Sequence, residues 1–203
     1  MFIAVTGPDG AGKTTLCDVL GQDGRASGTT PVVVAPLESG KKLALRFGAL
    51  PAPGPGRWAA REEWMAGYLC LCLVECAERF VLPAMEAGGT VVADKWVADL
   101  RVSQDYFGVD LSRWSAALSR LPVPDLTVVL HSSVDTLSRR LAEQGHDGPG
   151  ARQDYLEHAV RRYARLRGRP GMLHLAADAP TGENAARVRE ALVALPQQDG
   201  PGR

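Results

Sequence analysis

The chain has 203 residues, enough for one domain with a full hydrophobic core, and its 23 lysines and arginines balance its 23 aspartates and glutamates. A protein without net charge is not expected to bind nucleic acid polymers in general, because proteins that do so are usually basic. No apolar run reaches the ~18 residues of a membrane span, and a strand pattern begins directly after Met1, which argues against a signal peptide. We therefore expect a soluble, cytoplasmic domain over residues 1–196 and a disordered tail at 197–203.

The chain starts with an apolar strand pattern at residues 2–6, followed by a glycine-rich loop and a helix-compatible run at 16–20. The loop matches G-x-x-x-x-G-K-[ST], and its place between strand and helix is the context that identifies a phosphate-binding P-loop. Main-chain N–H groups of such a loop, together with the positive end of the helix that follows, bind phosphate oxygens. The predicted cradle for the phosphates of ATP is Gly7, Pro8, Asp9, Gly10, Ala11, Gly12, Lys13, Thr14 and Thr15.

Four more apolar runs follow, separated by segments long enough for helices. With the first, the predicted strands are Phe2–Thr6, Pro31–Ala35, Thr90–Ala93, Leu126–Leu130 and Met172–Leu175. The predicted helices are 13–21, 58–82, 111–119, 133–144, 152–167 and 183–194. Continuous apolar strands alternating with helices are typical of a parallel sheet that is covered on both faces. We therefore predict an α/β fold with a parallel sheet of about five strands.

Polar residues follow the third predicted strand, at the edge of the sheet where ligands bind in such folds. Asp94 ends this strand and Lys95 comes next, so both should lie on the same rim as the P-loop. Lys13 would reach the β- and γ-phosphates, and Thr14 and Asp94 would hold Mg²⁺. The alternative for Asp94 is that it only caps the N-terminus of a following helix. A glycine-rich interruption at 145–150 stands between two arginine-rich helices, which is typical of a mobile lid, near 141–154, or of a surface loop.

Longer stretches around these motifs resemble the thymidylate kinase family of nucleoside monophosphate kinases. The resemblance begins at 2–16, where the Asp-Gly-Ala-Gly-Lys core is more specific than a general P-loop. Residues 82–96 resemble the family's Pro-Ala-Leu helix end, strand and Asp-Arg-Tyr motif, and residues 124–130 resemble its fourth strand. Ser103 and Gln104 stand where the family has Tyr-Gln, so the resemblance covers nearly the whole chain.

The resemblance implies a single P-loop nucleotide kinase domain that transfers a phosphoryl group from Mg·ATP to a deoxynucleoside monophosphate (dTMP + ATP to dTDP + ADP, or a related acceptor). It assigns Asp9 to the acceptor sugar or a magnesium-bound water, and Lys95 to the acceptor phosphate. Gln104 would lie near the acceptor base or sugar, and Arg139 or Arg140 beside the adenine of ATP. A homodimer through the helix near 58–82, which is more apolar than one core face requires, is also implied.

Several positions depart from the family pattern. Lys95 replaces an arginine, which keeps the charge but loses the bidentate fork that grips a phosphate. Counting back from Pro83, the base-contacting arginine of the family becomes Leu73, and Asp99 replaces a serine, which makes Asp99 a further acceptor-site candidate. The lid region has no arginine between 141 and 151, so Arg152 is predicted to be the catalytic arginine of the lid. These changes indicate an altered acceptor or reduced activity.

Two other functions remain open from the sequence. A nucleoside kinase would transfer the phosphoryl group to a hydroxyl and would need a general base within hydrogen-bond reach, for which Glu38 and Asp9 are the candidates. A protein with an intact P-loop and a degraded acceptor site would instead be a non-catalytic ATP-binding module. The lid with few arginines favours the latter.

Overall fold

The computed structural model describes residues 1–26, 30–38, 42, 58–146 and 149–195. Its five strands form one parallel sheet in the order β2-β3-β1-β4-β5. Their bounds are β1 (Phe2–Thr6), β2 (Val32–Val34), β3 (Val91–Asp94), β4 (Leu126–His131) and β5 (Met172–Ala176). The predicted strands and the α/β class are therefore confirmed, while the tail predicted at 197–203 lies outside the described residues.

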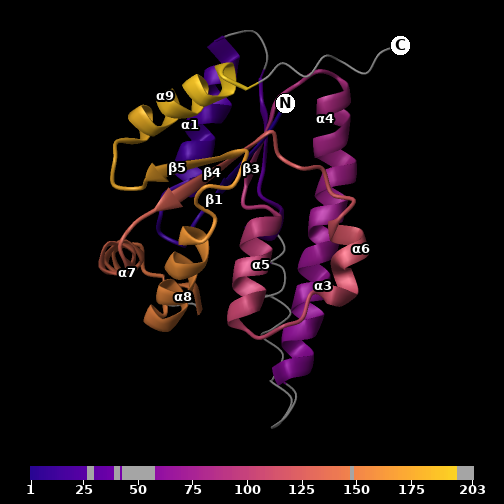
Figure 1. Cartoon of the computed structure of the whole chain (residues 1–203), viewed down its shortest axis with the longest axis vertical. Helices are drawn as coiled ribbons and strands as arrows, with labels where there is room; N and C mark the ends of the chain where they lie inside the picture. Colours follow the sequence, from indigo (N-terminus) through magenta and orange to yellow (C-terminus); the bar gives the residue numbers. More distant parts are fainter. Residues whose placement is uncertain (27–29, 39–41, 43–57, 147–148, 196–203) are drawn as a thin grey trace.

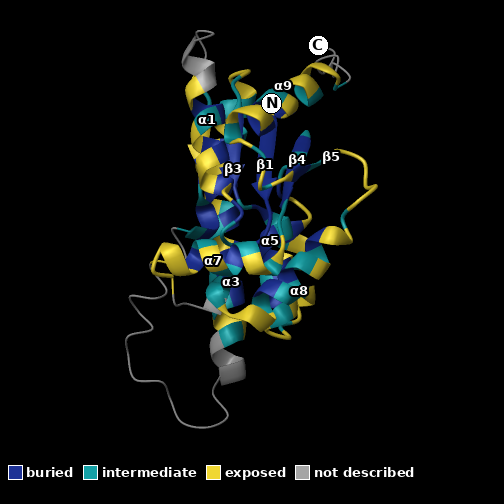
Figure 2. Ribbon diagram, turned by 90° about the vertical axis from the view of Figure 1, so that its left-hand side faces the viewer, coloured by how far each residue is buried: buried dark blue, intermediate teal, exposed yellow. Residues whose placement is uncertain are grey.

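The central strand β1 explains why the apolar runs are continuous rather than alternating. It pairs with β3 on one side, with Phe2 opposite Val91, and with β4 on the other, with Ile3 opposite Leu126. All five of its residues are buried, because helices cover both faces of the sheet. Figure 2 shows β1, β3 and β4 as the buried centre of the molecule.

Helices cover the two faces of the sheet as predicted (Figure 1). The face that carries Phe2 and Ala4 packs against α3, α5 and their neighbours, and the face that carries Ile3 and Val5 packs against α1, α7 and α9. The helices are α1 (Lys13–Ala26), α3 (Trp58–Cys76), α4 (Leu82–Glu86), α5 (Val97–Tyr106), α6 (Ser115–Leu118), α7 (Val134–Glu143), α8 (Gln153–Ala164) and α9 (Thr181–Val193). The shorter turns are η1 (Ala77–Val81, π-helical), η2 (Ser112–Trp114) and η3 (Pro149–Ala151).

The helix α5, directly after β3, is absent from the sequence-based prediction. Its buried side contains Leu100 and Val102, which are apolar, but also Asp99 and Gln104, which are polar. Polar residues on the buried side weaken the apolar periodicity by which a helix is recognised in a sequence. Such a conflict between local pattern and burial is typical of functional sites, and α5 does run from the P-loop rim.

The predicted helix at 58–82 is interrupted. The α-helix α3 ends at Cys76, the chain makes the π-helical turn η1, and α4 continues to Glu86. The predicted helix at 111–119 is likewise divided between η2 and α6. Within the described residues, no helix combines the length and the hydropathy that crossing a membrane requires.

Candidate active site

The P-loop joins β1 to α1, and glycine is required where it bends. A methyl group on Gly7 would lie 2.6 Å from the carbonyl oxygen of Leu130, and the φ angle of Gly7 is +146°. Gly10 has a φ angle of +82°, which side chains larger than hydrogen rarely adopt. The loop can therefore pass close to β4 and turn its main chain back toward the start of α1.

Lys13 lies inside this loop, with only 5% of its surface exposed. Its Nζ atom donates hydrogen bonds to the carbonyl oxygens of Gly7 (2.9 Å) and Pro8 (2.7 Å), and lies 3.6 Å from an oxygen of Asp9. Burial lowers the pKa of Lys13, and the nearby charge of Lys95 lowers it further, whereas the surrounding carboxylates oppose this shift. The P-loop therefore contains a buried cation whose present partners are main-chain carbonyls and one carboxylate.

Thr14 and Asp94 meet across the rim. The Thr14 hydroxyl donates to Asp94 Oδ2 at 2.5 Å, although 80 positions separate the two residues. The other oxygen, Asp94 Oδ1, is buried and has no hydrogen-bond partner among the described residues. Asp94 is not a helix cap, since α5 begins after Trp96 and the carboxylate at that helix end belongs to Asp99. The alternative that Asp94 only caps a helix is therefore wrong.

Lys95 extends the charged rim beyond Asp94. Its Nζ lies 2.9 Å from Asp9 Oδ1, so Asp9 faces both lysines of the site. Burial acts to lower the pKa of Lys95, but the charge and hydrogen bond of Asp9 outweigh this effect and raise the pKa above its ordinary value. Among the described residues, Lys95 is the only non-glycine with a positive φ angle, +70°. This conformation costs roughly 1–2 kcal/mol and is found most often at functional sites.

The predicted lid approaches the P-loop through Leu141, beside Gly10, and through Gly150. Gly150, in η3, packs directly on the Asp9 carboxylate, so a methyl group there would overlap Asp9 Oδ2 and lie 3.3 Å from Asp9 Cγ. The contact joins residues 141 positions apart in the chain, and the sequence motifs give no sign of it.

The family model described as thymidylate kinase matches residues 5–188. The chain belongs to the thymidylate kinase family. It is 30% identical over 152 residues to the thymidylate kinase of Ruegeria pomeroyi, which covers 72% of this chain and 71% of that protein. It is also 30% identical over 187 residues to the thymidylate kinase of Pelotomaculum thermopropionicum, an alignment that covers 88% of this chain and 81% of that protein. A third relative, the thymidylate kinase of Xanthomonas campestris, is 30% identical over 169 residues, which are 82% of this chain and 71% of that protein. This thymidylate kinase family member is therefore a nucleotide kinase, a phosphotransferase that acts on small nucleotides.

Helix α5 carries two acceptor candidates, Asp99 and Gln104, and their surroundings differ. Asp99 is buried, accepts the Trp96 main-chain N–H at 3.0 Å and accepts the Tyr163 hydroxyl at 2.8 Å. Both of its oxygens are therefore used to hold the start of α5 against α8. Gln104 is 2% exposed, and its Oε1 has no hydrogen-bond partner among the described residues. The geometry thus favours Gln104 as a ligand-binding residue and a structural role for Asp99.

The two arginines predicted near adenine point in different directions. Arg140 donates to the Ala177 carbonyl oxygen at 3.3 Å, lies 3.1 Å from Asp178 and reaches the Gly10 carbonyl oxygen at 3.5 Å. Arg139 lies on the surface, 3.9 Å from Glu143. Adjacent residues of a helix point about 100° apart, so only one of them can face the P-loop. The structure brings Arg140 to the loop.

Other predicted residues are held by neighbours outside the rim. Arg152 is exposed and paired with Asp154 at 2.8 Å, close to Gly150 in the chain. Glu38 lies 3.5 Å from Lys42 in an exposed ion pair. Leu73 is fully buried in the core that α3, β3 and α5 share, so the position predicted to correspond to the family's base-contacting arginine is filled by apolar packing.

Two tyrosines of α8 lie near the site but belong to none of the sequence motifs. Burial raises the pKa of Tyr155, and the charges of Asp9 and Lys95 are near enough to influence it in opposite directions. Tyr163 is buried against Asp99, which together with burial raises its pKa well above the ordinary value. Their role depends on the packing of α8 against α5, which the sequence does not reveal.

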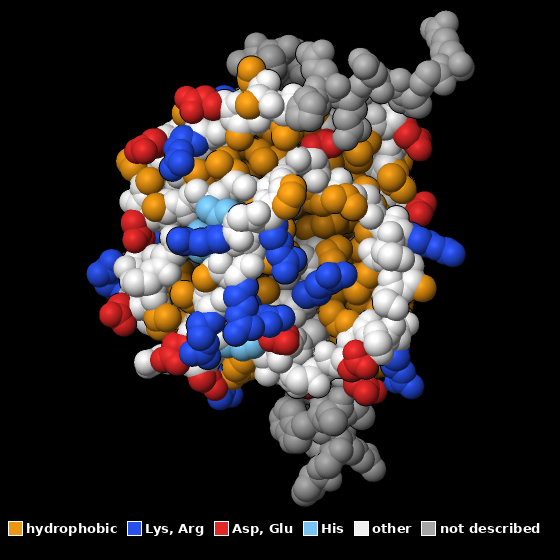
Figure 3. Space-filling view, in the orientation of Figure 1, with side chains coloured by type: hydrophobic (Ala, Val, Ile, Leu, Met, Phe, Trp, Pro, Cys, Tyr) orange, Lys and Arg blue, Asp and Glu red, His pale blue; other side chains and the backbone are white. Residues whose placement is uncertain are grey.

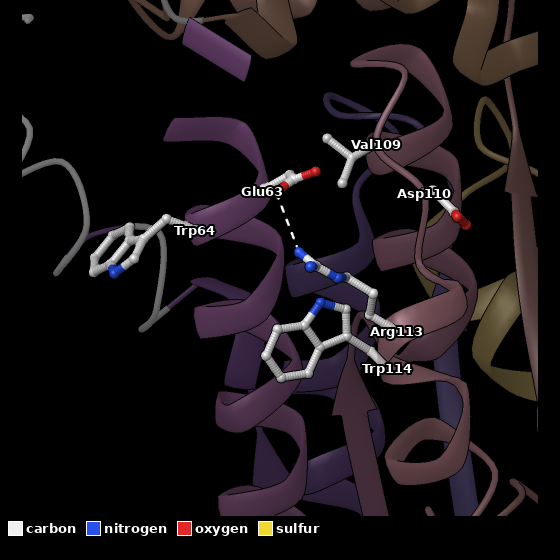
Figure 4. Close-up of a pocket in the computed structure, with 6 residues that line it drawn as sticks. All are labelled: Glu63, Trp64, Val109, Asp110, Arg113 and Trp114. Atoms are coloured by element: carbon white, nitrogen blue, oxygen red, sulfur yellow. Dashed lines mark hydrogen bonds and ion pairs between the residues drawn. The ribbon is translucent and has the colours of Figure 1, made fainter. Parts of the chain in front are cut away.

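A separate hollow lies between α3 and the segment that links α5 to α6 (Figure 4). Arg113 and Glu63 face each other across it at 3.5 Å, and the Trp114 ring packs against α3 at Gly67. Trp64 points away from the others, toward solvent. None of the residues lining it belongs to the P-loop rim, so we do not assign it to the nucleotide site.

Proposed function

We propose that this kinase transfers the γ-phosphoryl group of Mg·ATP to a deoxynucleoside monophosphate, with dTMP as the first acceptor to test. The observation that carries the proposal is the contact between Thr14 and Asp94, which leaves a buried carboxylate oxygen beside the P-loop lysine with no hydrogen-bond partner in the part of the chain that the structure describes. Transfer of a phosphoryl group requires positioning and charge neutralisation more than covalent chemistry. The lysines and carboxylates of the rim are suited to both.

The residues present fit Mg²⁺ and ATP. Asp94 Oδ1 and the Thr14 hydroxyl are oxygen ligands of the kind that Mg²⁺ prefers, and few protein ligands suffice because this ion keeps waters and takes phosphate oxygens. When bound, the ion would neutralise charge on the β- and γ-phosphates. Lys13 would exchange the carbonyl oxygens of Gly7 and Pro8 for phosphate oxygens. Arg140, held at the Ala177 carbonyl and near Gly10, would lie beside the adenine.

For the acceptor, Lys95 would contact the phosphate while Asp9 orients its ammonium group. The Oε1 atom of Gln104, which has no partner within the described segments, would accept a hydrogen bond from the base or sugar, since a buried amide oxygen gains about 1–3 kcal/mol from a partner. Figure 3 shows that Lys and Arg side chains gather on the face formed by α5 and α8, which favours an anionic ligand. Arg152 would neutralise charge on the transferring group.

The test is ADP release from Mg·ATP in the presence of dTMP, other deoxy- and ribonucleoside monophosphates, and free nucleosides, with Lys13→Ala as the blank. Turnover on dTMP supports the proposal. Turnover on nucleosides alone would favour the nucleoside kinase, and Glu38→Gln would then show whether Glu38 is its base. ATP binding without transfer to any acceptor would contradict the proposed activity.

We also propose that two copies of the chain pair through the outer side of α3 and η1. Large apolar side chains are exposed there, namely Trp64 (56%), Leu71 (58%) and Phe80 (47%), and a second copy would bury them. Sedimentation equilibrium should give twice the mass of one chain, and Leu71→Glu should give a monomer. Val123→Glu is the control, because Val123 is also apolar and exposed (82%) but lies between α6 and β4. A monomeric wild-type protein would refute the pairing.

A further inference from the structure

The ends of α5 and α8 are joined by a polar contact outside the P-loop rim. Tyr106 is the last residue of α5, and its hydroxyl donates to Asp154 Oδ2 at 2.8 Å, across 48 positions of sequence. The Tyr106 ring also stands edge-on against Tyr155 at 5.0 Å and against His158 at 5.6 Å between ring centres. The hydroxyl is therefore placed by ring packing, and it reaches the carboxylate from a fixed position.

The same carboxylate holds the arginine of the lid. Arg152 Nε donates to Asp154 Oδ1 at 3.1 Å, and Arg152 Nη2 donates to Asp154 Oδ2 at 2.8 Å. The main-chain N–H of Tyr155 donates to Oδ1 at 3.0 Å. With the Tyr106 hydroxyl, Asp154 accepts four hydrogen bonds on its two oxygens. A guanidinium bound on two of its nitrogens is fixed in orientation, whereas a free arginine side chain samples many rotamers.

This arrangement is close in the chain both to a contact with the P-loop and to the acceptor candidate on α5. Gly150 contacts the Asp9 carboxylate, and Arg152 follows two residues later, a main-chain span of at most about 7 Å. On the other side, Tyr106 follows two residues after Gln104 on α5. The contact thus connects the lid segment that packs on the P-loop to the helix that carries the acceptor candidate.

We propose that Tyr106 is a positioning residue for phosphoryl transfer, because it holds Asp154, and Asp154 fixes Arg152 two residues away from the contact of Gly150 with the P-loop. The inference rests on the proposed role of Arg152 in neutralising charge on the transferring group. When Arg152 exchanges the carboxylate for phosphate oxygens, the Tyr106 hydroxyl and the Tyr155 N–H remain as donors to Asp154. They keep this carboxylate from following Arg152 toward the phosphates, where its charge would oppose transfer.

The variant Tyr106→Phe keeps the ring and removes only the hydroxyl. We expect kcat to fall about fivefold, with KM for both substrates within about twofold, because the bond from the Tyr106 hydroxyl is solvent-exposed and contributes as an ordinary hydrogen bond. In the Arg152→Ala background, adding Tyr106→Phe should produce no further fall, because its effect passes through Arg152. An equal fall in both backgrounds would mean a general structural role and would overturn the proposal. Arg161→Ala is the matched arginine control, since Arg161 pairs with Glu157 on α8, 3.9 Å away.

A measurement without substrate separates this inference from the proposed function. In ¹⁵N spectra of arginine side chains, the Arg152 Nε–H signal should move in Tyr106→Phe toward the position of solvent-exposed arginines, while the Arg161 signal stays. An unmoved Arg152 signal would overturn the positioning role whatever the enzyme phosphorylates. Full kcat in Arg152→Ala would refute the role of this arginine in transfer, and with it the inference.

Discussion

Replacing Gly150 by alanine tests whether the contact between lid and P-loop matters for catalysis. The added methyl group would overlap Asp9 Oδ2, so roughly 1 Å of space must open between η3 and the carboxylate. The φ angle of Gly150 is not positive, so alanine can adopt the backbone conformation of this position without strain. Either the Asp9 carboxylate turns away from Lys95, or η3 moves away from the P-loop.

For each of these two responses, the expected loss of kcat/KM can be worked out. The bond between Lys95 and Asp9 is 2.9 Å long and about four-fifths shielded from solvent on both sides, and a charge-assisted bond of this kind contributes about 1.5–3 kcal/mol. If this contribution is lost in the transition state, kcat/KM falls about 10- to 100-fold. A shift of η3 by a similar distance would misplace Arg152 and is expected to cost about as much.

Steady-state kinetics with Mg·ATP and the best acceptor give the comparison, and urea unfolding shows whether the fold is affected. Gly182→Ala is the matched control, because a methyl group at this second position of α9 meets no atom within 4 Å. We expect the control to keep its activity and to be slightly stabilised, as alanine is favoured over glycine in helices. If kcat/KM of Gly150→Ala stays within about twofold of the wild type, the contact with Asp9 has no part in the reaction and the reasoning is wrong.

Three more outcomes are expected. Tyr163→Phe leaves one oxygen of buried Asp99 without its hydroxyl donor and should lower the free energy of unfolding in urea by about 1.5–3 kcal/mol, whereas an unchanged midpoint would exclude a structural bond. Asp94→Asn should raise the Mg²⁺ concentration for half-maximal activity at least about tenfold, and an unaltered Mg²⁺ titration would remove Asp94 from the metal site. Burial, with the nearby charge of His174, lowers the pKa of His131 from 6.5 to about 4. Between pH 6.5 and pH 4, His131 is therefore protonated in the unfolded chain but neutral in the folded chain. The free energy of unfolding should fall as the pH drops through this range, and the contribution of His131 should become constant below pH 4. His131→Gln should weaken that dependence, and identical pH profiles would contradict it.

Much of the site follows from local sequence. The P-loop, its lysine and its threonine are adjacent in the chain, and the motif itself predicts a glycine at position 7. The strands were also predictable from their apolar runs, which are continuous in β1 because that strand is buried on both faces. The family resemblance, carried by these same segments, is confirmed by the family model that spans residues 5–188.

The tertiary structure decided which polar residues meet. Helix α5 escaped prediction because Asp99 and Gln104 occupy its buried side. Only the packing of α8 shows that Asp99 is bound by Tyr163, whereas Gln104 Oε1 has no hydrogen-bond partner among the residues described. The choice between Arg139 and Arg140 depends on the rotation of α7 about its axis, which a motif does not contain. The physical reason is common to these cases: local sequence indicates where the P-loop and the apolar strands form, whereas burial of polar residues and contacts between distant residues depend on how whole helices pack.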